Sequence, residues 1–109
     1  MVPLQMLPKD ALPLLDDPSW VWVDVREEDE FDYGHIPGIK HFPMSSLTPD
    51  SFAPFSKEQK IMVVCRTGSR SGRVVHALRE MGYMHACNFS VGMVGYNMVA
   101  PSHIPVLMH

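Results

Sequence analysis

The stretch KIMVVCRTGSRSGRVVHALREMG, from Lys60 to Gly82, contains the pattern that decides the fold. Its first part, Lys60–Cys65, is an apolar run with β-branched residues, which predicts a buried strand. After a polar loop, apolar residues recur at the spacing of one helical face: Val74, Val75, Leu78 and Met81. Gly82 then ends the predicted helix. A strand, a short loop and a helix in this order are typical of a parallel βαβ unit.

The same alternation continues on both sides of this stretch. Trp20–Val25, an apolar run rich in β-branched and aromatic residues, predicts a second buried strand, and Ile39–Pro43 and His85–Phe89 are interpreted as two further short strands. Three further segments predict helices: 26–34 with Gly34 as its stop, 48–55 with Thr48 as N-cap and Pro49 in its first position, and 91–100 as a weak terminal helix. The predicted fold class is α/β, a small parallel sheet flanked by helices on both faces.

Length and composition predict one soluble domain over residues 1–109. The net charge of −3 excludes strong nonspecific attraction to nucleic acid. We predict no membrane partner, because no signal peptide pattern begins the chain and no apolar stretch approaches the roughly 18 residues that span a bilayer. Two cysteines are too few for a disulfide scaffold, which predicts a reducing compartment, the cytoplasm.

The charges are unevenly distributed along the chain. Nine of the twelve acidic residues lie between Asp10 and Asp32, and six of the nine Lys and Arg residues lie between Lys57 and Arg79. This asymmetry predicts a locally positive field in the half that contains Cys65, which would suit a small anionic ligand. The alternative is two ordinary solvated faces, and charge counts alone favour that alternative.

Cys65 lies where the predicted strand ends and the polar loop begins, at the edge of a parallel sheet where ligands bind. It is either a buried core residue or a nucleophile. Gly68 permits a sharp turn, so that successive backbone N–H groups and the start of the following helix surround the sulfur and stabilise a thiolate. Such surroundings depress a cysteine pKa. Because this polar loop with two arginines is atypical of a core cysteine, we interpret Cys65 as functional.

Other candidate residues have weaker signals. Asp24 and Arg26 end the first strong strand, where they either shape the rim of the site or form a structural ion pair, the interpretation we favour. His35 is expected to hold its loop, with proton transfer as the alternative. Cys87 is interpreted as a core residue, with a role as resolving thiol for Cys65 as the alternative. The six histidines are scattered without ligand spacing to a cysteine, so no metal site is predicted.

Two motifs together resemble the rhodanese, or sulfurtransferase, family. They are CRTGSRS, residues 65–71, and VDVREEDEFDYGHIPGIKHFP, residues 23–43, and the resemblance runs from about Trp20 to Phe89. It implies a small parallel sheet flanked by helices, and Cys65 as a nucleophile that takes sulfur from an anionic donor such as thiosulfate. The Cys65 persulfide would then pass this sulfur to cyanide or another thiol, without a metal or organic cofactor. The residues that would bind the substrate are Arg66, Thr67, Gly68, Ser69, Arg70 and Ser71.

Two alternatives remain open beside the small-molecule enzyme. The first is a persulfide relay or binding module that serves a protein partner. The second is a cysteine-dependent phosphatase of the form His-Cys-(x)5-Arg, but here Arg70 follows Cys65 by five positions instead of six and Val64 replaces the histidine. At the carboxyl end the chain has Val91–Gly92 and Tyr96 where the family usually has Gly-Gly and tryptophan. We expect this departure to alter the rim of the pocket.

Overall fold

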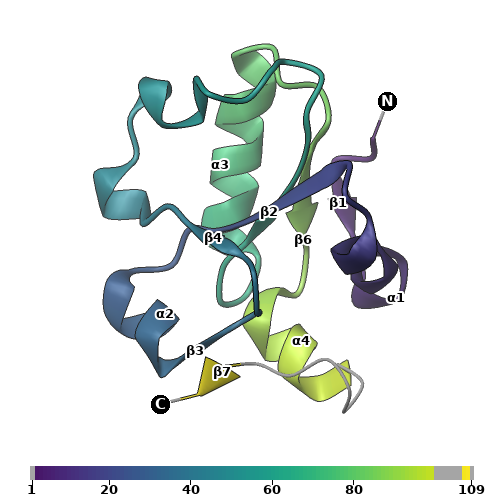
Figure 1. Cartoon of the computed structure of the whole chain (residues 1–109), viewed down its shortest axis with the longest axis vertical. Helices are drawn as coiled ribbons and strands as arrows, with labels where there is room; N and C mark the ends of the chain where they lie inside the picture. The colour runs from purple at the N-terminus through teal and green to yellow at the C-terminus, as the bar shows by residue number, and fades with distance from the viewer. Residues whose placement is uncertain (1, 100–106, 109) are drawn as a thin grey trace.

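The computed structural model describes residues 2–99, 107 and 108, and its centre is a parallel sheet (Figure 1). Five strands have the spatial order β1-β6-β5-β2-β4, and every neighbouring pair is parallel. Their bounds are β1 (Gln5–Met6), β2 (Trp20–Asp24), β4 (Lys40–His41), β5 (Lys60–Val64) and β6 (Ala86–Phe89). A separate antiparallel pair joins β3 (Gly34–His35) to β7 (Leu107–Met108).

Helices connect these strands and cover both faces of the sheet. The α-helices are α1 (Pro8–Ala11), α2 (Glu28–Tyr33), α3 (Ser69–Glu80) and α4 (Gly92–Val99), and 3₁₀ helices span Leu12–Asp16, Met44–Ser46 and Pro49–Phe52. The predicted α/β architecture, with a small parallel sheet flanked by helices on both faces, is confirmed. Among the described residues, no helix combines the length and apolar character that crossing a bilayer would require.

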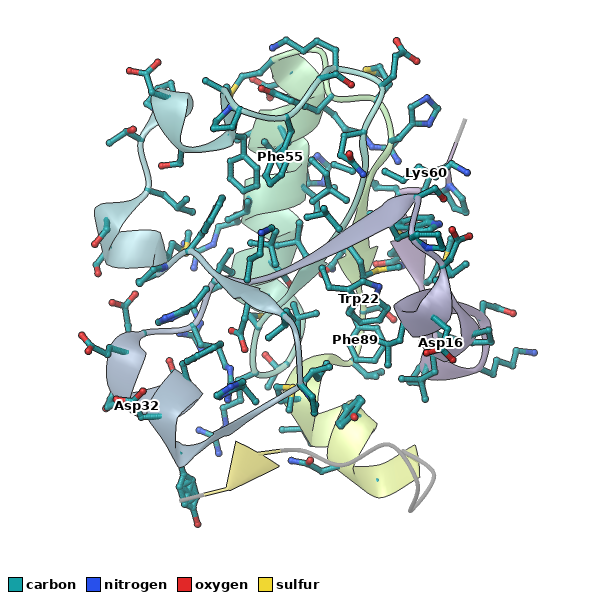
Figure 2. All side chains as sticks on the ribbon, viewed as in Figure 1. Asp16, Trp22, Asp32, Phe55, Lys60 and Phe89 are labelled. Atoms are coloured by element: carbon teal, nitrogen blue, oxygen red, sulfur yellow. The ribbon has the colours of Figure 1, made fainter. Side chains whose placement is uncertain are left out.

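The alternation of side chains along the strands creates two hydrophobic cores. On one face, α3 packs through Val74, Val75 and Leu78 against Val63 and its neighbours on the sheet. The opposite face contains a second set of buried residues, from the sheet and from α1 and α4: Ala11, Trp22, Met62, Cys87, Phe89, Met93 and Tyr96. Figure 2 shows Trp22 and Phe89 next to each other, and their ring centroids are 5.6 Å apart.

Several elements differ from the sequence predictions. The edge strand β1, which pairs with β6, and the short helix α1 were not predicted, because two and four residues are too few to show a period. The predicted strand at Ile39–Pro43 is limited to Lys40 and His41, which pair with the end of β2. The segment predicted as a helix from Thr48 forms only one 3₁₀ turn, although its capping box between Thr48 and Ser51 is present.

Because the strands are parallel, the residues that follow β2, β5 and β6 lie at one edge of the sheet. The start of α4 contacts the loop after β5 there: the Met93 amide donates to the Cys65 carbonyl at 2.8 Å, and the Val94 amide donates to that of Arg66 at 3.0 Å. Gly92 makes this approach possible, since its φ is +57° and an added Cβ would lie 2.5 Å from the Cys65 carbonyl oxygen. The cysteine loop therefore packs between α3 and α4.

Candidate active site

Cys65 comes directly after β5, and the loop that follows turns back over its sulfur. Gly68 has a φ of +98°, and a Cβ at this position would lie 2.1 Å from the Ser90 carbonyl oxygen. Only glycine fits this conformation and this space. The turn points the Gly68 amide at the Cys65 sulfur, with 3.1 Å between nitrogen and Sγ. The predicted turn at Gly68 is thus present, and it directs an amide donor to the sulfur.

Further donors surround the Cys65 sulfur. The Ser71 hydroxyl, in the first turn of α3, lies 3.2 Å from Sγ. Burial raises the pKa of the thiol, but hydrogen bonds from the Ser71 side chain and from the amides of Ser71, Gly68 and Thr67 outweigh it, and the net pKa is lowered. A hydrogen bond donated to the thiolate favours the charged form, which is the nucleophilic one. The surroundings therefore favour the reactive form of Cys65.

The Cys65 side chain is closed off from solvent. The residue is 0% exposed and belongs to the hydrophobic core that α3 covers. Reactive cysteines are usually partly exposed, so this burial is a departure from the common pattern. The exposed residues of the loop above it are Arg66, Thr67 and Ser69. A substrate can reach the sulfur only if part of this loop moves.

Asn88, in β6, is a site residue that the sequence analysis missed. Its side-chain oxygen lies 2.5 Å from the Ser71 hydroxyl oxygen and shares the single hydroxyl proton with the Cys65 sulfur, and its amide nitrogen donates to the Gly68 carbonyl at 3.0 Å. Asn88 is buried, with 7% of its surface exposed, and its backbone pairs with Val63. Asn88 therefore contacts both Ser71, whose hydroxyl lies near the Cys65 sulfur, and Gly68, whose amide donates to that sulfur. The sequence contained one signal for this role, because Asn88 is a polar residue within a strand that was predicted to be buried.

Arg70 has a partner on another element. Its guanidinium forms a bidentate salt bridge with the Glu30 carboxylate on α2, at 2.6 and 2.8 Å. The Arg70 side chain lowers the Glu30 pKa to about 2, against a smaller opposing effect of burial. Arg70 was expected, with Arg66, to attract an anionic donor. The structure instead directs Arg70 toward Glu30, which compensates its charge.

A cavity of about 500 Å³ lies beside the loop, between α2 and α4. The charged residues that line it are Arg26, Arg66, Asp29 and Glu30, so that two positive and two negative charges face it. The locally positive field that the uneven charge distribution allowed around Cys65 is therefore offset on this side by acids of α2. Among the described residues, no cluster of three or more His, Cys, Asp and Glu side chains suits a metal ion.

Asp24 and Arg26, at the end of β2, form a buried ion pair. Arg26 donates to the Asp24 carboxylate from Nη2 at 2.8 Å and from Nε at 3.0 Å, and to the Gly34 carbonyl at 2.7 Å. Asp24 is 0% exposed and Arg26 is 6% exposed. The ion pair that we favoured for these residues is present, and the hydrogen bond from Arg26 to Gly34 links the end of β2 to β3. Arg26 also reaches the cavity wall.

His35 lies in an aromatic stack with Phe31. Its ring stacks on Phe31 with centroids 3.7 Å apart, and its Nδ1 lies 2.8 Å from the Phe31 carbonyl oxygen. His41 stacks on Phe31 as well, at 4.0 Å. These contacts agree with the expected role of His35 in holding its loop.

The departure at residues 91–96 places Gly92 against the cysteine loop and Tyr96 in the core. Gly92 occupies the position where α4 approaches the Cys65 carbonyl, so the glycine that this contact needs is retained. Tyr96 is 0% exposed and packs in the core on the opposite face of the sheet, where burial raises the pKa of its hydroxyl. The cavity wall is formed here by Met93 and Val94, and Tyr96 contributes to the core instead of the rim.

Comparisons with known proteins identify the family of the chain. The model of the rhodanese-like domain matches residues 7–98. A thiosulfate sulfurtransferase, GlpE, from Tolumonas auensis is 29% identical over 93 residues, which are 85% of this chain and 87% of that protein. The Rhodanese-like/PpiC domain-containing protein 12, chloroplastic, of Arabidopsis thaliana is 30% identical over 86 residues, which are 76% of this chain but 29% of that protein.

A solved structure shows the same fold. The solution structure of a rhodanese-like domain from Anabaena sp. superposes with a TM-score of 0.84 and 20% identity, covering 99% of this chain and 81% of that one. The extent of a single domain over all of residues 1–109 stays a prediction, since the family match ends at residue 98. The match over residues 7–98, together with the shared fold, shows that the chain belongs to the family of rhodanese-like domains.

Proposed function

We propose that the protein is a sulfurtransferase that carries sulfane sulfur as a persulfide on Cys65. The observation that supports this proposal best is the pair of donors on the Cys65 sulfur, the Gly68 amide at 3.1 Å and the Ser71 hydroxyl at 3.2 Å. They stabilise a negative sulfur at the junction of a strand and a helix, where ligands of parallel sheets bind. Relatives named as sulfurtransferases support the same activity.

In the first half-reaction, the Cys65 thiolate attacks the outer sulfur of a donor such as thiosulfate. A bond forms between Sγ and that sulfur, the S–S bond of thiosulfate breaks, and sulfite leaves with the electron pair. In the second half-reaction, cyanide or a thiolate attacks the outer sulfur of the persulfide and the Cys65 thiolate leaves. Two half-reactions through one covalent intermediate give ping-pong kinetics.

The loop has a separate role in each state of Cys65. In the resting enzyme its donors stabilise the thiolate, and after transfer the amides between Arg66 and Ser71 would stabilise the outer, negatively charged sulfur in the same way. Arg66 is exposed at the cavity and is placed to attract an anionic donor. This mechanism uses no metal or organic cofactor.

The phosphatase alternative is less well supported. A phosphoryl group has three equatorial oxygens to bind, and the loop between Cys65 and Arg70 is one residue shorter than the phosphatase form. Arg70 is also engaged by Glu30, which competes with any bound phosphate for the guanidinium. Turnover of thiosulfate compared with hydrolysis of an aryl phosphate separates the two activities.

A relay to a protein thiol is the second candidate. The cavity beside Cys65 opens between α2 and α4, where Tyr33 and Val94 are exposed apolar side chains. Such a rim is compatible with a protein acceptor as well as with a small thiol. Both cysteines are free thiols, and a thiolate nucleophile requires reduction, so the proposal includes a reducing compartment such as the cytoplasm.

Mass spectrometry of the intact protein after incubation with thiosulfate tests the proposal. We expect a gain of one sulfur atom in the wild type, its loss on addition of cyanide, and no gain in Cys65→Ala. Cys87→Ala is the matched control, since it removes the other buried thiol, and it should gain sulfur as the wild type does. A gain that survives in Cys65→Ala would place the chemistry on another residue and contradict the proposal.

A further inference from the structure

The salt bridge between Arg70 and Glu30 joins the sulfur loop to α2. Both guanidinium nitrogens Nη1 and Nη2 of Arg70 donate to the two carboxylate oxygens of Glu30, at 2.6 and 2.8 Å. This bidentate geometry is the strong and directional form of the arginine–carboxylate pair. The Arg70 side chain is therefore held against Glu30, and its full positive charge is not available to bind a substrate.

Glu30 is itself fixed and stays charged. The Glu27 amide donates to the Glu30 carboxylate at 3.1 Å as part of the capping box of α2. Its hydrogen bonds to Arg70 hold the pKa of the Glu30 carboxyl at about 2. The carboxylate is thus ionised at every pH at which the protein would work, and it compensates the Arg70 charge continuously.

The other charges at the cavity do not restore a positive field. Arg26 is paired with the buried Asp24. Asp29 adds a negative charge to the lining. Among the described residues that line the cavity, Arg66 is the cation without a salt bridge. A dianion that approaches Cys65 therefore meets one uncompensated cation together with the acids of α2.

The effect of these site charges on a sulfur donor depends on the charge of the donor. The Coulomb energy of a ligand in a given field is proportional to its charge, so each site charge acts on a dianion twice as strongly as on a monoanion in the same place. A carboxylate beside the loop penalises thiosulfate, with two charges, more than a sulfur donor of similar shape with one.

We propose that Glu30 determines donor specificity by neutralising Arg70, so that the site favours sulfane-sulfur donors with a single negative charge over dianions. The inference rests on the proposed sulfur transfer to Cys65 and adds its substrate class. Thiosulfonates and the anions of organic persulfides belong to this class. Glu30 acts through Arg70 and does not touch the reacting sulfur, so it is a specificity-determining residue and not a catalytic one.

Two matched donors isolate the effect of charge. Methanethiosulfonate replaces one oxygen of thiosulfate with a methyl group, so it is similar in size but has one negative charge instead of two. The Cys65 thiolate attacks its outer sulfur, the S–S bond breaks, and methanesulfinate leaves with the electron pair, just as sulfite leaves thiosulfate. Both reactions give the same Cys65 persulfide, and total charge is conserved in each.

The experiment measures the single-turnover rate of persulfide formation by quenched-flow mass spectrometry, with each donor below saturation. The readout is the selectivity ratio, the second-order rate constant for thiosulfate divided by that for methanethiosulfonate. In Glu30→Gln, which keeps a side chain able to complete the capping box, we expect this ratio to rise roughly threefold to tenfold over the wild type. A ratio within one protein sample does not depend on the fraction that is folded.

Two further variants test the route of the effect. Asp32→Asn is the matched control, because it removes the same charge from the same helix at an exposed position on α2 (Figure 2), and it should leave the ratio unchanged. In the Arg70→Gln background, Glu30→Gln should no longer raise the ratio, because the charge that Glu30 compensates is gone. Added salt should reduce the difference between wild type and Glu30→Gln.

The outcomes separate this inference from the proposed function. Equal ratios in the wild type and Glu30→Gln, with Cys65 loaded by both donors, would overturn the role of Glu30 and leave the sulfurtransferase intact. An equal rise in Asp32→Asn, or a rise that persists without Arg70, would overturn the pairing mechanism. If neither donor places sulfur on Cys65, the sulfurtransferase proposal fails and the specificity inference fails with it.

Discussion

Cys65 and Cys87 are both 0% exposed and lie at neighbouring strands of one sheet, yet their surroundings shift their acidity in opposite directions. Burial raises the pKa of Cys87 to about 11, with only a small opposing effect from Arg79. Burial acts on Cys65 as well, but hydrogen bonds from Ser71, Gly68 and Thr67 bring its pKa below the ordinary value. Burial alone therefore does not determine whether a thiol is inert.

The two thiols also lie on opposite faces of the sheet. Cys87 pairs in register with Met62, and both belong to the core beneath α1 and α4. Cys65 belongs to the core beneath α3. The alternative role of Cys87 as a resolving thiol for Cys65 does not fit this arrangement, because the sheet separates the two sulfurs. The interpretation of Cys87 as a core residue agrees with the structure.

The largest expected difference between the two cysteines is their rate of alkylation. With a pKa of about 11, Cys87 is a thiolate in about one molecule in ten thousand at pH 7. Iodoacetamide should therefore modify Cys65 at least about a hundredfold faster than Cys87 in the folded protein, through local opening of the loop. Peptide mass mapping over time gives both rates. Equal alkylation rates at the two cysteines in native buffer would contradict the predicted difference in their pKa values.

A side chain at Gly68 should disturb the loop around Cys65 and leave the surroundings of Cys87 unchanged. In Gly68→Ala the strained φ and the collision with Ser90 should cost about 2 kcal/mol or more of unfolding free energy and slow alkylation of Cys65. Gly38→Ala is the matched control, because Gly38 also has a positive φ, of +80°, but open space around it. It should cost about 1 kcal/mol. Urea unfolding measures both, and equal losses would contradict the role of the close contact.

Removing the Ser71 hydroxyl should raise the pKa of Cys65 and so reduce its difference from Cys87. Ser71→Ala deletes one donor to the sulfur, and a hydrogen bond worth about 1 kcal/mol corresponds to about a fivefold lower rate of Cys65 alkylation at pH 7. The pH profile of that rate should move to higher pH, since the lost donor favoured the thiolate. Ser46→Ala, at an exposed serine far along the chain, serves as control. An unchanged profile in Ser71→Ala would show that the amides suffice.

A further expected effect is on stability as a function of pH, where the two cysteines have opposite signs. Cys65 has a lowered pKa in the folded state, so the unfolded chain holds more protons and its contribution to stability grows as pH rises toward about 9. Cys87 has a raised pKa, so the folded chain holds more protons and its contribution is lost between about pH 9 and pH 11. Urea unfolding of wild type, Cys65→Ala and Cys87→Ala across this range measures both slopes. Cys87→Ala should reduce the decline above pH 9, part of which belongs to Tyr96, whose pKa is also raised by burial. An unaltered decline would refute the assignment.

Much of the site was predictable because it lies in one continuous segment. The run from Lys60 to Gly82 contains its own strand, turn and helix signals, and Gly68 was the residue at which the chain had to turn. Asn88 and Glu30 were not predicted as site residues, since their contacts with Ser71 and Arg70 cross 17 and 40 positions of the chain. No local period or spacing records such contacts. The same reason explains the missed pairing of β1 with β6.

By itself the sequence determined the α/β class, the position of Cys65 between a strand and a helix, and the loop whose backbone donors surround its sulfur. These follow from local periodicity and from the conformational freedom of one glycine, which act within a few residues. Only the tertiary structure decided that Cys65 is fully closed off, that Arg70 is neutralised by Glu30, and that Cys87 lies across the sheet. The physical reason is that burial, ion pairing and the face on which a residue lies depend on strand register and on which helices cover each side of the sheet. Strand register and helix placement are both set by contacts between distant parts of the chain.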